Sequence, residues 1–283
     1  MNWWSRIFGS PPRKPAPGGE PEPAGAEVVY RESVYRDGSR RRTLASGREL
    51  ALPPYSYNAD GLATVHDASF LADPRFRDAY RSGAHSGHRI CPPEQLHIEW
   101  RVYVCCWAAK HAAQLPGDFA ECGVSTGVVS LAVCHYVGFE KLPKTFWLFD
   151  TYGGIPEEQV SDAERPLALS KNQRHYFDSY DLVKKNFAAY PNVRLVRGQL
   201  PEALEESAPG ALAYLHIDMN IAYPEVEASR RLWDRVTRGG VVVYDDYASP
   251  AHAEQKRALD AFAAERGVEI LSLPTGQGLL LRA

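Results

Sequence analysis

The chain has 283 residues, of which 45% are hydrophobic and 24% are charged, and its formal net charge is −3. This length can bury a full α/β core, and the composition is that of an ordinary water-soluble globular protein. The weak negative charge excludes the basic surface that binds nucleic acid, so we expect no nucleic-acid partner. No apolar run approaches the ~20 residues that cross a bilayer, so we expect no transmembrane segment.

The cysteines indicate a reducing compartment. Their number is odd and their spacing matches no metal site, so we expect neither a disulfide framework nor a zinc site. Free thiols persist in the cytosol, and we therefore expect a cytoplasmic protein. The five positions are Cys91, Cys105, Cys106, Cys122 and Cys134.

The first third of the chain divides into two parts by composition. Residues 9–26 are rich in glycine, proline, serine, glutamate and alanine, so we expect a disordered tail or linker over 1–26. Residues 27–92 are expected to form an N-terminal extension that caps the substrate side. Apolar clusters alternate with charge over 28–52, which leaves strands and irregular segments both open. A helix is expected over 67–80, and the glycines and histidines of 82–88 predict a loop.

The stretch Gly-Asp-Phe-Ala-Glu-Cys-Gly-Val-Ser-Thr-Gly, at 117–127, predicts a ligand-binding turn. A buried strand is expected over 118–122, and the apolar run from Val128 predicts a helix. Gly123 and Gly127 allow a sharp turn and a close approach of the backbone to a ligand. The helix directs its first N–H groups toward the same place. We therefore expect a nucleotide-binding unit, with an ordinary strand-to-helix turn as the alternative.

The glycine spacing distinguishes among nucleotide ligands. Glu-x-Gly-x-x-x-Gly differs from the Gly-x-Gly-x-x-Gly of dinucleotide folds. The carboxylate of Glu121, just before the first glycine, would repel a pyrophosphate but suits a cation or an amine. S-adenosylmethionine carries a sulfonium and an α-amino group, so this turn fits it better than it fits NAD.

Strands and helices alternate in the remaining chain, which predicts a parallel sheet covered on both faces. Strands are expected over 145–149, 193–196, 211–217 and 241–244, and helices over 95–115, 182–189, 201–206, 224–236 and 253–266. The segments 268–273 and 279–282 instead predict an antiparallel hairpin. Because such a hairpin is typical of class I methyltransferases, we expect that Rossmann-like α/β fold, with a mostly parallel seven-stranded sheet.

Ligands of open α/β sheets bind beyond the carboxyl ends of the strands. The polar residues at those ends are Glu121, Asp150, Gln199, Asp218, Asp245 and Asp246. A carboxylate at the position of Asp150 can accept both hydroxyls of a ribose; a helix cap or turn residue is the alternative.

The sharper candidate is a set of three aspartates at neighbouring strand ends. Asp218 ends one strand, and Asp245 and Asp246 follow the next. Carboxylates that converge without basic neighbours repel one another. A hard divalent cation, Mg²⁺ or Mn²⁺, relieves this repulsion through oxygen ligands. The alternative is one helix cap beside two solvated carboxylates.

Four motifs together resemble the macrocin O-methyltransferase family. They are 117–123, Phe149-Asp-Thr-Tyr-Gly-Gly-Ile-Pro156, Leu215-His-Ile-Asp218 and Gly239-Gly-Val-Val-Val-Tyr-Asp-Asp-Tyr247. The resemblance covers residues 93–283, which would form the methyltransferase domain. It implies a class I enzyme that uses S-adenosylmethionine and Mg²⁺ to methylate sugar hydroxyls of natural products. It also implies a homodimer or a larger homo-oligomer.

The resemblance implies a role for each matching residue. The metal ligands would be Asp218, Asp245 and Asp246. The methyl donor would be held by Glu121, Gly123, Ser125, Thr126, Gly127, Asp150, Gln199 and Asp218, with Gln199 near the adenine.

One position departs from the family pattern. The sugar enzymes carry a second aspartate, the general base, two residues after the first metal ligand, where this chain has Asn220. An amide cannot accept a proton at neutral pH. Either water acts on a hydroxyl that the metal has acidified, or another base serves. His252 is the first candidate and His175 the second, whereas His216 is expected to be a satisfied core histidine.

These observations favour an S-adenosylmethionine- and Mg²⁺-dependent O-methyltransferase acting on a sugar or another polyhydroxylated small molecule. A non-catalytic S-adenosylmethionine-binding module of a larger assembly is the alternative, which Asn220 favours. The glycine spacing and the hairpin disfavour an NAD-dependent oxidoreductase. The long segment 152–190 predicts either a lid over the acceptor or a structural helix-loop.

Overall fold

The computed structural model describes residues 30–35, 38–44 and 46–283, and the tail expected over 1–26 lies outside them. The chain divides into a unit that ends at Tyr55 and a larger unit from Ser56 to Ala283. Among the helices of the described residues, none combines the length and the apolar character that crossing a membrane requires.

The first unit contains a small antiparallel sheet. Its strands are β1 (Tyr30–Val34), β2 (Arg40–Leu44) and β3 (Glu49–Leu52), in that order across the sheet. Arg40 supports the β1–β2 pairing, since its Nε atom lies 2.9 Å from the Oε1 atom of Glu32. Of the segment 28–52, which the sequence left open between strands and irregular structure, residues 30–34, 40–44 and 49–52 form strands.

The second unit begins with a hairpin and a helix. The hairpin joins β4 (Tyr57–Ala59) to β5 (Leu62–Thr64). Helix α2 (Pro74–Ala84) begins where Asp73 accepts a hydrogen bond from the N–H of Arg75. Gly83 lets α2 approach the next layer closely, because a Cβ atom at that position would lie 2.1 Å from the carbonyl oxygen of Val128.

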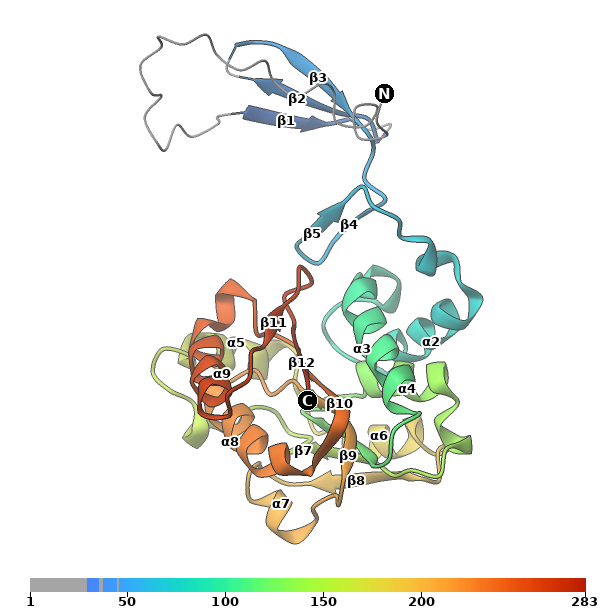
Figure 1. Ribbon diagram of the computed structural model, residues 1–283, viewed down its shortest axis with the longest axis vertical. Helices are drawn as coiled ribbons and strands as arrows, with labels where there is room; N and C mark the ends of the chain where they lie inside the picture. The colour runs from blue at the N-terminus through green and yellow to red at the C-terminus, as the bar shows by residue number, and fades with distance from the viewer. Residues whose placement is uncertain (1–29, 36–37, 45) are drawn as a thin grey trace. The chain divides into compact units, whose positions relative to one another are not determined.

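A seven-stranded sheet organises the second unit, with the strand order β11-β12-β10-β9-β6-β7-β8 (Figure 1). Its strands are β6 (Asp118–Cys122), β7 (Phe146–Asp150), β8 (Val193–Arg197), β9 (Leu212–Ile217), β10 (Val236–Tyr244), β11 (Leu271–Ser272) and β12 (Gly278–Leu281). Strands β6 to β10 run parallel, whereas β12 pairs antiparallel with β10 and β11. The expected seven-stranded sheet with a C-terminal antiparallel hairpin is confirmed.

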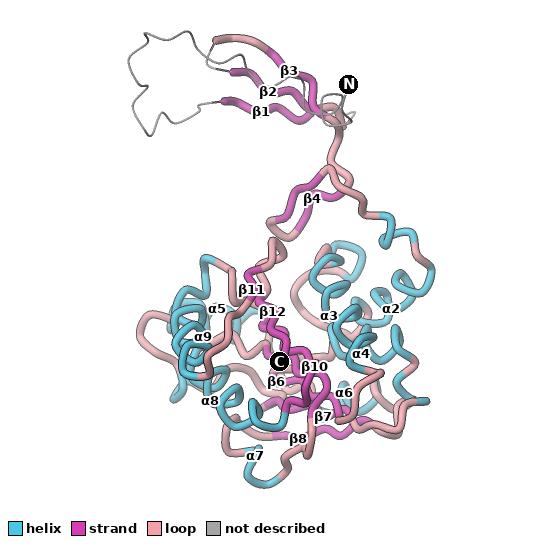
Figure 2. The backbone as a smooth tube through the Cα atoms, viewed as in Figure 1, coloured by secondary structure: helices cyan, strands magenta, loops and turns pink. Residues whose placement is uncertain are grey.

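Helices cover both faces of this sheet. They are α3 (Glu99–Ala112), α4 (Val128–Val137), α5 (Arg165–Arg174), α6 (Tyr180–Asn186), α7 (Ala203–Glu206), α8 (Ala222–Leu232) and α9 (Ala253–Glu265). Figure 2 shows α2, α3 and α4 on one side of the strands and α8 and α9 on the other. A doubly covered sheet exposes mainly its edges, so ligand chemistry is concentrated at the carboxyl ends of the strands.

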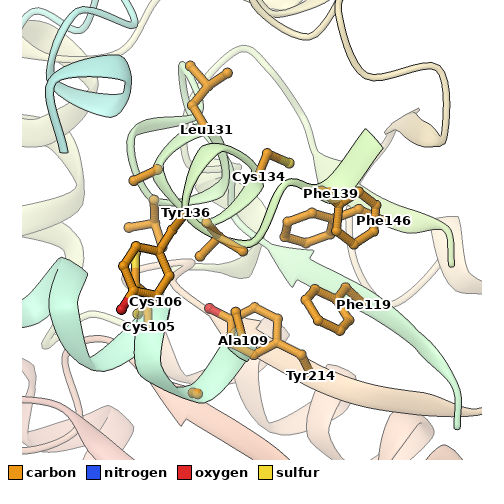
Figure 3. Close-up of a cluster of buried hydrophobic side chains, with 14 of the residues drawn as sticks. Cys105, Cys106, Ala109, Phe119, Leu131, Cys134, Tyr136, Phe139, Phe146 and Tyr214 are labelled. Carbon is orange, nitrogen blue, oxygen red and sulfur yellow. The ribbon is translucent and has the colours of Figure 1, made fainter. Parts of the chain in front are cut away.

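The alternation of side chains along β6 separates two hydrophobic cores. Phe119 belongs to the core beneath α3 and α4, whereas Ala120 and Cys122 belong to the core beneath α8 and α9. In the first core the ring of Phe119 lies beside that of Tyr214, with centroids 5.2 Å apart (Figure 3). Glu121 shares the face of Phe119 because it lies two residues further along the strand, and it is therefore directed toward α3 and α4.

Candidate functional site

A cavity that is partly open to solvent lies at the carboxyl ends of the strands. Five of the residues predicted to hold the methyl donor line it, namely Gly123, Ser125, Asp150, Gln199 and Asp218. The other three, Glu121, Thr126 and Gly127, are not among the lining residues. The cavity therefore lies at the edge of the sheet that the sequence indicated, and the binding of the methyl donor by these residues stays a prediction.

The glycine turn after β6 requires its glycines. Gly123 has a φ of +88°, and a Cβ atom there would lie 1.9 Å from the backbone oxygen of Asp218. Gly127 has a φ of +93°, and a Cβ atom there would meet the ring of Phe187 at 2.8 Å. Thr126 is buried, and its Oγ1 atom lies 2.8 Å from the hydroxyl of Ser86. Thr126 and Gly127 therefore shape the turn from behind the cavity.

Asp150 joins this turn to β7. Its Oδ2 atom accepts hydrogen bonds from the N–H groups of Val124 and Ser125, at 2.6 and 2.7 Å. Its Oδ1 atom accepts from the N–H of Tyr152 at 2.5 Å. Burial raises the pKa of Asp150, although these backbone donors act in the opposite direction. The side chain thus orders the turn while it lines the cavity, and its contact with a ribose stays a prediction.

The carboxyl groups of Asp218, Asp245 and Asp246 converge beside the cavity. Each offers one oxygen, and the three oxygens lie within 4.8 Å of one another. Burial, together with the charges of Asp245 and Asp246, raises the pKa of Asp218 to about 8. The carboxyl ends of β9 and β10 therefore form the acidic cluster that the sequence predicted.

The expectation that this acidic cluster lacks basic neighbours is wrong. The Nη1 atom of Arg101, on α3, lies 2.7 Å from the Oδ2 atom of Asp245 and 3.2 Å from the Oδ1 atom of Asp246. Lys171, on α5, places its Nζ atom 3.9 Å from the Oδ2 atom of Asp246. Burial acts to raise the pKa of Asp245, but Arg101 and His216 outweigh it and hold that pKa well below its usual range.

The charge of the acidic cluster still suits a divalent cation. Arg101 also contacts Asp60 in the β4–β5 turn, with Nε 3.1 Å from Oδ2. Asp60 and the three clustered aspartates supply four carboxyl groups, which outnumber the two fixed cations of Arg101 and Lys171. Within the described ranges, the Oδ2 atom of Asp218 accepts no hydrogen bond. An excess of carboxyl groups that offers oxygen ligands fits Mg²⁺ or Mn²⁺.

Asn220 lies at the junction of the cavity and the acidic cluster. Its Nδ2 group donates to the Oδ1 atom of Asp218 at 2.9 Å, and its Oδ1 atom accepts from the Nζ atom of Lys171. It adopts a left-handed backbone conformation, with φ of +64°. The amide therefore occupies the position expected for a general base, but it is held by its neighbours as a hydrogen-bonding group.

Of the two candidate bases, only His252 reaches the acidic cluster. Its Nε2 atom lies 3.4 Å from the Oδ2 atom of Asp246 and 3.5 Å from the Nζ atom of Lys171. Burial lowers the pKa of His252, which favours the neutral imidazole that a base requires. The Nδ1 atom of His175 lies instead near the backbone oxygen of Arg89, at 3.5 Å.

The long segment 152–190 contributes one wall of the cavity. Its lining residues include Tyr152, Tyr176, Phe177 and Ser179. Helix α5 lies within this segment and carries Lys171, which the sequence analysis missed. Both interpretations of the segment, lid and structural helix-loop, remain predictions, because a wall can be fixed or mobile.

Two solved structures share this fold. The O-methyltransferase NovP matches with a TM-score of 0.58 over 65% of this chain and 79% of that chain, at 23% identity. The calicheamicin methyltransferase CalS11 matches with a TM-score of 0.57 over 77% of this chain and 94% of that chain, at 18% identity. The chain therefore has the class I methyltransferase fold.

The sequence comparison narrows this class to a family. The family model described as Macrocin-O-methyltransferase (TylF) matches residues 103–271, more than half of the chain. The chain belongs to this family, and the resemblance carried by the four motifs is confirmed.

Two curated relatives with similar sequences are named as O-methyltransferases. Mycinamicin III 3''-O-methyltransferase of Micromonospora griseorubida is 25% identical over 50% of this chain, and the match spans 59% of that relative's own length. The second is 8-demethyl-8-(2,3-dimethoxy-alpha-L-rhamnosyl)-tetracenomycin-C 4'-O-methyltransferase of Streptomyces olivaceus. It is 28% identical over 66% of this chain and 72% of its own length.

Proposed function

We propose that this protein transfers the methyl group of S-adenosylmethionine to a hydroxyl of a sugar or of another polyhydroxylated natural product, with Mg²⁺ or Mn²⁺ at the acidic cluster. The observation that carries the proposal is the position of Asp218. This residue lines the cavity and also belongs to the acidic cluster, so a donor and a cation would be neighbours. The family assignment and the names of the sugar-methylating relatives support the same activity.

In this proposal each residue has a stated task. The turn at Gly123 and the lining residues Asp150 and Gln199 bind the donor. Asp218, Asp245 and Asp246 would hold the cation, which when bound lowers the pKa of a coordinated hydroxyl. The cavity orients the acceptor oxygen in line with the methyl group, and such positioning supplies several kcal/mol of catalysis.

The reaction also needs a proton acceptor. As the acceptor oxygen forms its bond to the methyl carbon, the bond from that carbon to sulfur breaks and the hydroxyl proton must leave. The amide of Asn220 cannot take it. We assign this step to His252, whose Nε2 atom lies beside the acidic cluster, with Asn220 orienting Asp218.

Product analysis tests the proposed function directly. The full-length protein, S-adenosylmethionine and Mg²⁺ are incubated with a panel of glycosylated and phenolic acceptors, and products are examined by mass spectrometry. We expect a singly methylated glycoside in the presence of Mg²⁺ and none in EDTA. Sedimentation of the same protein tests the proposed homodimer.

A second function is favoured by the amide at position 220. A non-catalytic module would bind S-adenosylmethionine in the same cavity but would transfer no methyl group to any acceptor. Calorimetry that detects donor binding, combined with the absence of product across the panel, would support this alternative.

A further inference from the structure

Two buried polar residues behind the acidic cluster have no task in the proposed reaction. They are Glu121 on β6 and His216 on β9, which are 2% and 0% exposed. They lie directly opposite each other across the β6–β9 pairing. Glu121 does not line the cavity, so its burial is not explained by contact with the methyl donor.

The imidazole of His216 lies between two carboxylates. Its Nδ1 atom is 3.2 Å from the Oε1 atom of Glu121, and its Nε2 atom is 3.5 Å from the Oδ1 atom of Asp245. Each ring nitrogen thus faces one carboxyl group. The three side chains join β6, β9 and β10 in a single line that ends at a proposed metal ligand.

Burying these polar side chains lowers the stability of the fold unless other interactions compensate. Burying a carboxylate requires a partner to compensate for the lost hydration, and apolar residues would pack this core at lower cost. Within the described part of the chain, the Oε2 atom of Glu121 has no hydrogen-bond partner. The packing of this core therefore does not explain why position 121 has a carboxyl group.

The remaining contacts of Asp245 show what His216 adds. Gln277 donates from Nε2 to the Oδ1 atom of Asp245 at 3.0 Å, and Arg101 donates to its Oδ2 atom at 2.7 Å. His216 approaches the same Oδ1 atom from the strand beside β10. Gln277 and Arg101 therefore hold the two oxygens by hydrogen bonds, whereas the Nε2 atom of His216, which has no hydrogen-bond partner in the described structure, faces the Oδ1 atom at 3.5 Å.

We infer that Glu121 and His216 are positioning residues for the metal site: Glu121 fixes the ring of His216, and His216 orients the carboxylate of Asp245 for a divalent cation. This inference rests on the metal site of the proposed function. Groups that orient a ligand from behind typically change metal affinity by about 10- to 100-fold when they are replaced. On this inference Glu121 supports the binding of the cation and does not bind the methyl donor.

Binding measurements separate these two assignments. In Glu121→Gln the full-length protein is titrated with Mn²⁺, followed by electron paramagnetic resonance, and separately with S-adenosylmethionine, followed by calorimetry. We expect the Mn²⁺ dissociation constant to rise by about tenfold or more, with the donor dissociation constant unchanged. Tyr214→Phe is the control, because Tyr214 is fully buried on β9, two residues from His216, and its hydroxyl has no partner in the described structure.

Two substitutions of His216 test the direction of the line. In His216→Gln, the amide N–H of glutamine replaces Nε2, the ring nitrogen that faces Asp245. In His216→Asn, the amide N–H of asparagine replaces Nδ1, the ring nitrogen that faces Glu121. We expect His216→Gln to retain most of the Mn²⁺ affinity and His216→Asn to lose it. A purely structural role for the histidine would affect both variants alike.

Several outcomes would overturn the inference. Weaker donor binding with unchanged Mn²⁺ affinity in Glu121→Gln would return Glu121 to the donor site. Equal losses of both ligands, with a melting temperature well below that of Tyr214→Phe, would show a structural role only. If the wild type and the variants bind Mn²⁺ as expected but the wild type methylates no acceptor, the proposed function is contradicted and the inference still holds.

Discussion

His252 places its Nε2 atom 3.4 Å from the Oδ2 atom of Asp246. The imidazole is 8% exposed, and its Nδ1 atom lies 3.1 Å from the hydroxyl of Ser249. The hydroxyl of Ser249 therefore orients the ring, and the other ring nitrogen faces the acidic cluster. Since Asn220 cannot accept a proton, His252 is the base in the proposed reaction.

The first prediction concerns His252→Ala. Loss of a general base typically costs about 10²- to 10⁴-fold in turnover, and we expect kcat to fall within that range. Burial lowers the pKa of His252, so the neutral form persists to lower pH and the acid limb of the wild-type rate profile should lie below the ordinary value of ~6.5. The rate falls as pH drops through that limb. Unchanged turnover in His252→Ala between pH 6 and pH 9 would eliminate this base.

The second prediction restores a carboxylate at position 220. In His252→Ala, the additional change Asn220→Asp should recover about tenfold or more of the lost turnover, because a carboxylate can accept the proton that the amide cannot. Asn220→Ala in the same background is the control, since both changes remove the hydrogen bond donated to Asp218 but alanine supplies no base. Equal rates in the two double variants would show that proton acceptance at this position does not limit the reaction.

The elements that the sequence predicted best are those set by local patterns. The strand over 118–122 was predicted with the bounds that β6 has, because short apolar runs bounded by turn residues depend little on distant contacts. The acidic cluster followed from one general rule, since the carboxyl ends of neighbouring parallel strands meet at one edge. The fold class and the acidic cluster could therefore be predicted from the sequence.

The basic side chains around the acidic cluster were not accessible in this way. Arg101 reaches Asp245 across 144 positions of sequence, and Lys171 comes from a helix in the long segment before β8. The directions of these two side chains depend on how α3 and α5 pack in the fold. Helical periodicity in the sequence does not predict that packing. The direction of Glu121 could have been found, because its two-residue spacing from Phe119 already places both side chains on one face.

The third prediction tests the cation at the acidic cluster. Asp245→Asn removes the charge of a proposed ligand that Arg101 and Gln277 also contact. We expect kcat to fall by about a hundredfold or more, which is the typical loss when one group that stabilises charge in the transition state is removed. The residual rate should no longer respond to Mg²⁺ or to EDTA. Asp260→Asn is the control, because Asp260 is paired with Lys256 on α9, at 2.8 Å. Full wild-type activity in EDTA would refute metal dependence.

The last prediction concerns the glycine turn that brings β6 to the cavity. In Gly123→Ala the new Cβ atom would lie 1.9 Å from the backbone oxygen of Asp218, at a φ of +88°. Backbone strain and overpacking each cost about 1–3 kcal/mol, so we expect the free energy of unfolding to fall by roughly 2–6 kcal/mol. Gly138→Ala separates the two effects, because its φ is also positive, at +65°, but a Cβ atom there meets nothing within 4 Å. Chemical denaturation should show the smaller loss in Gly138→Ala; equal losses would mean that close approach to Asp218 adds nothing to the requirement for glycine.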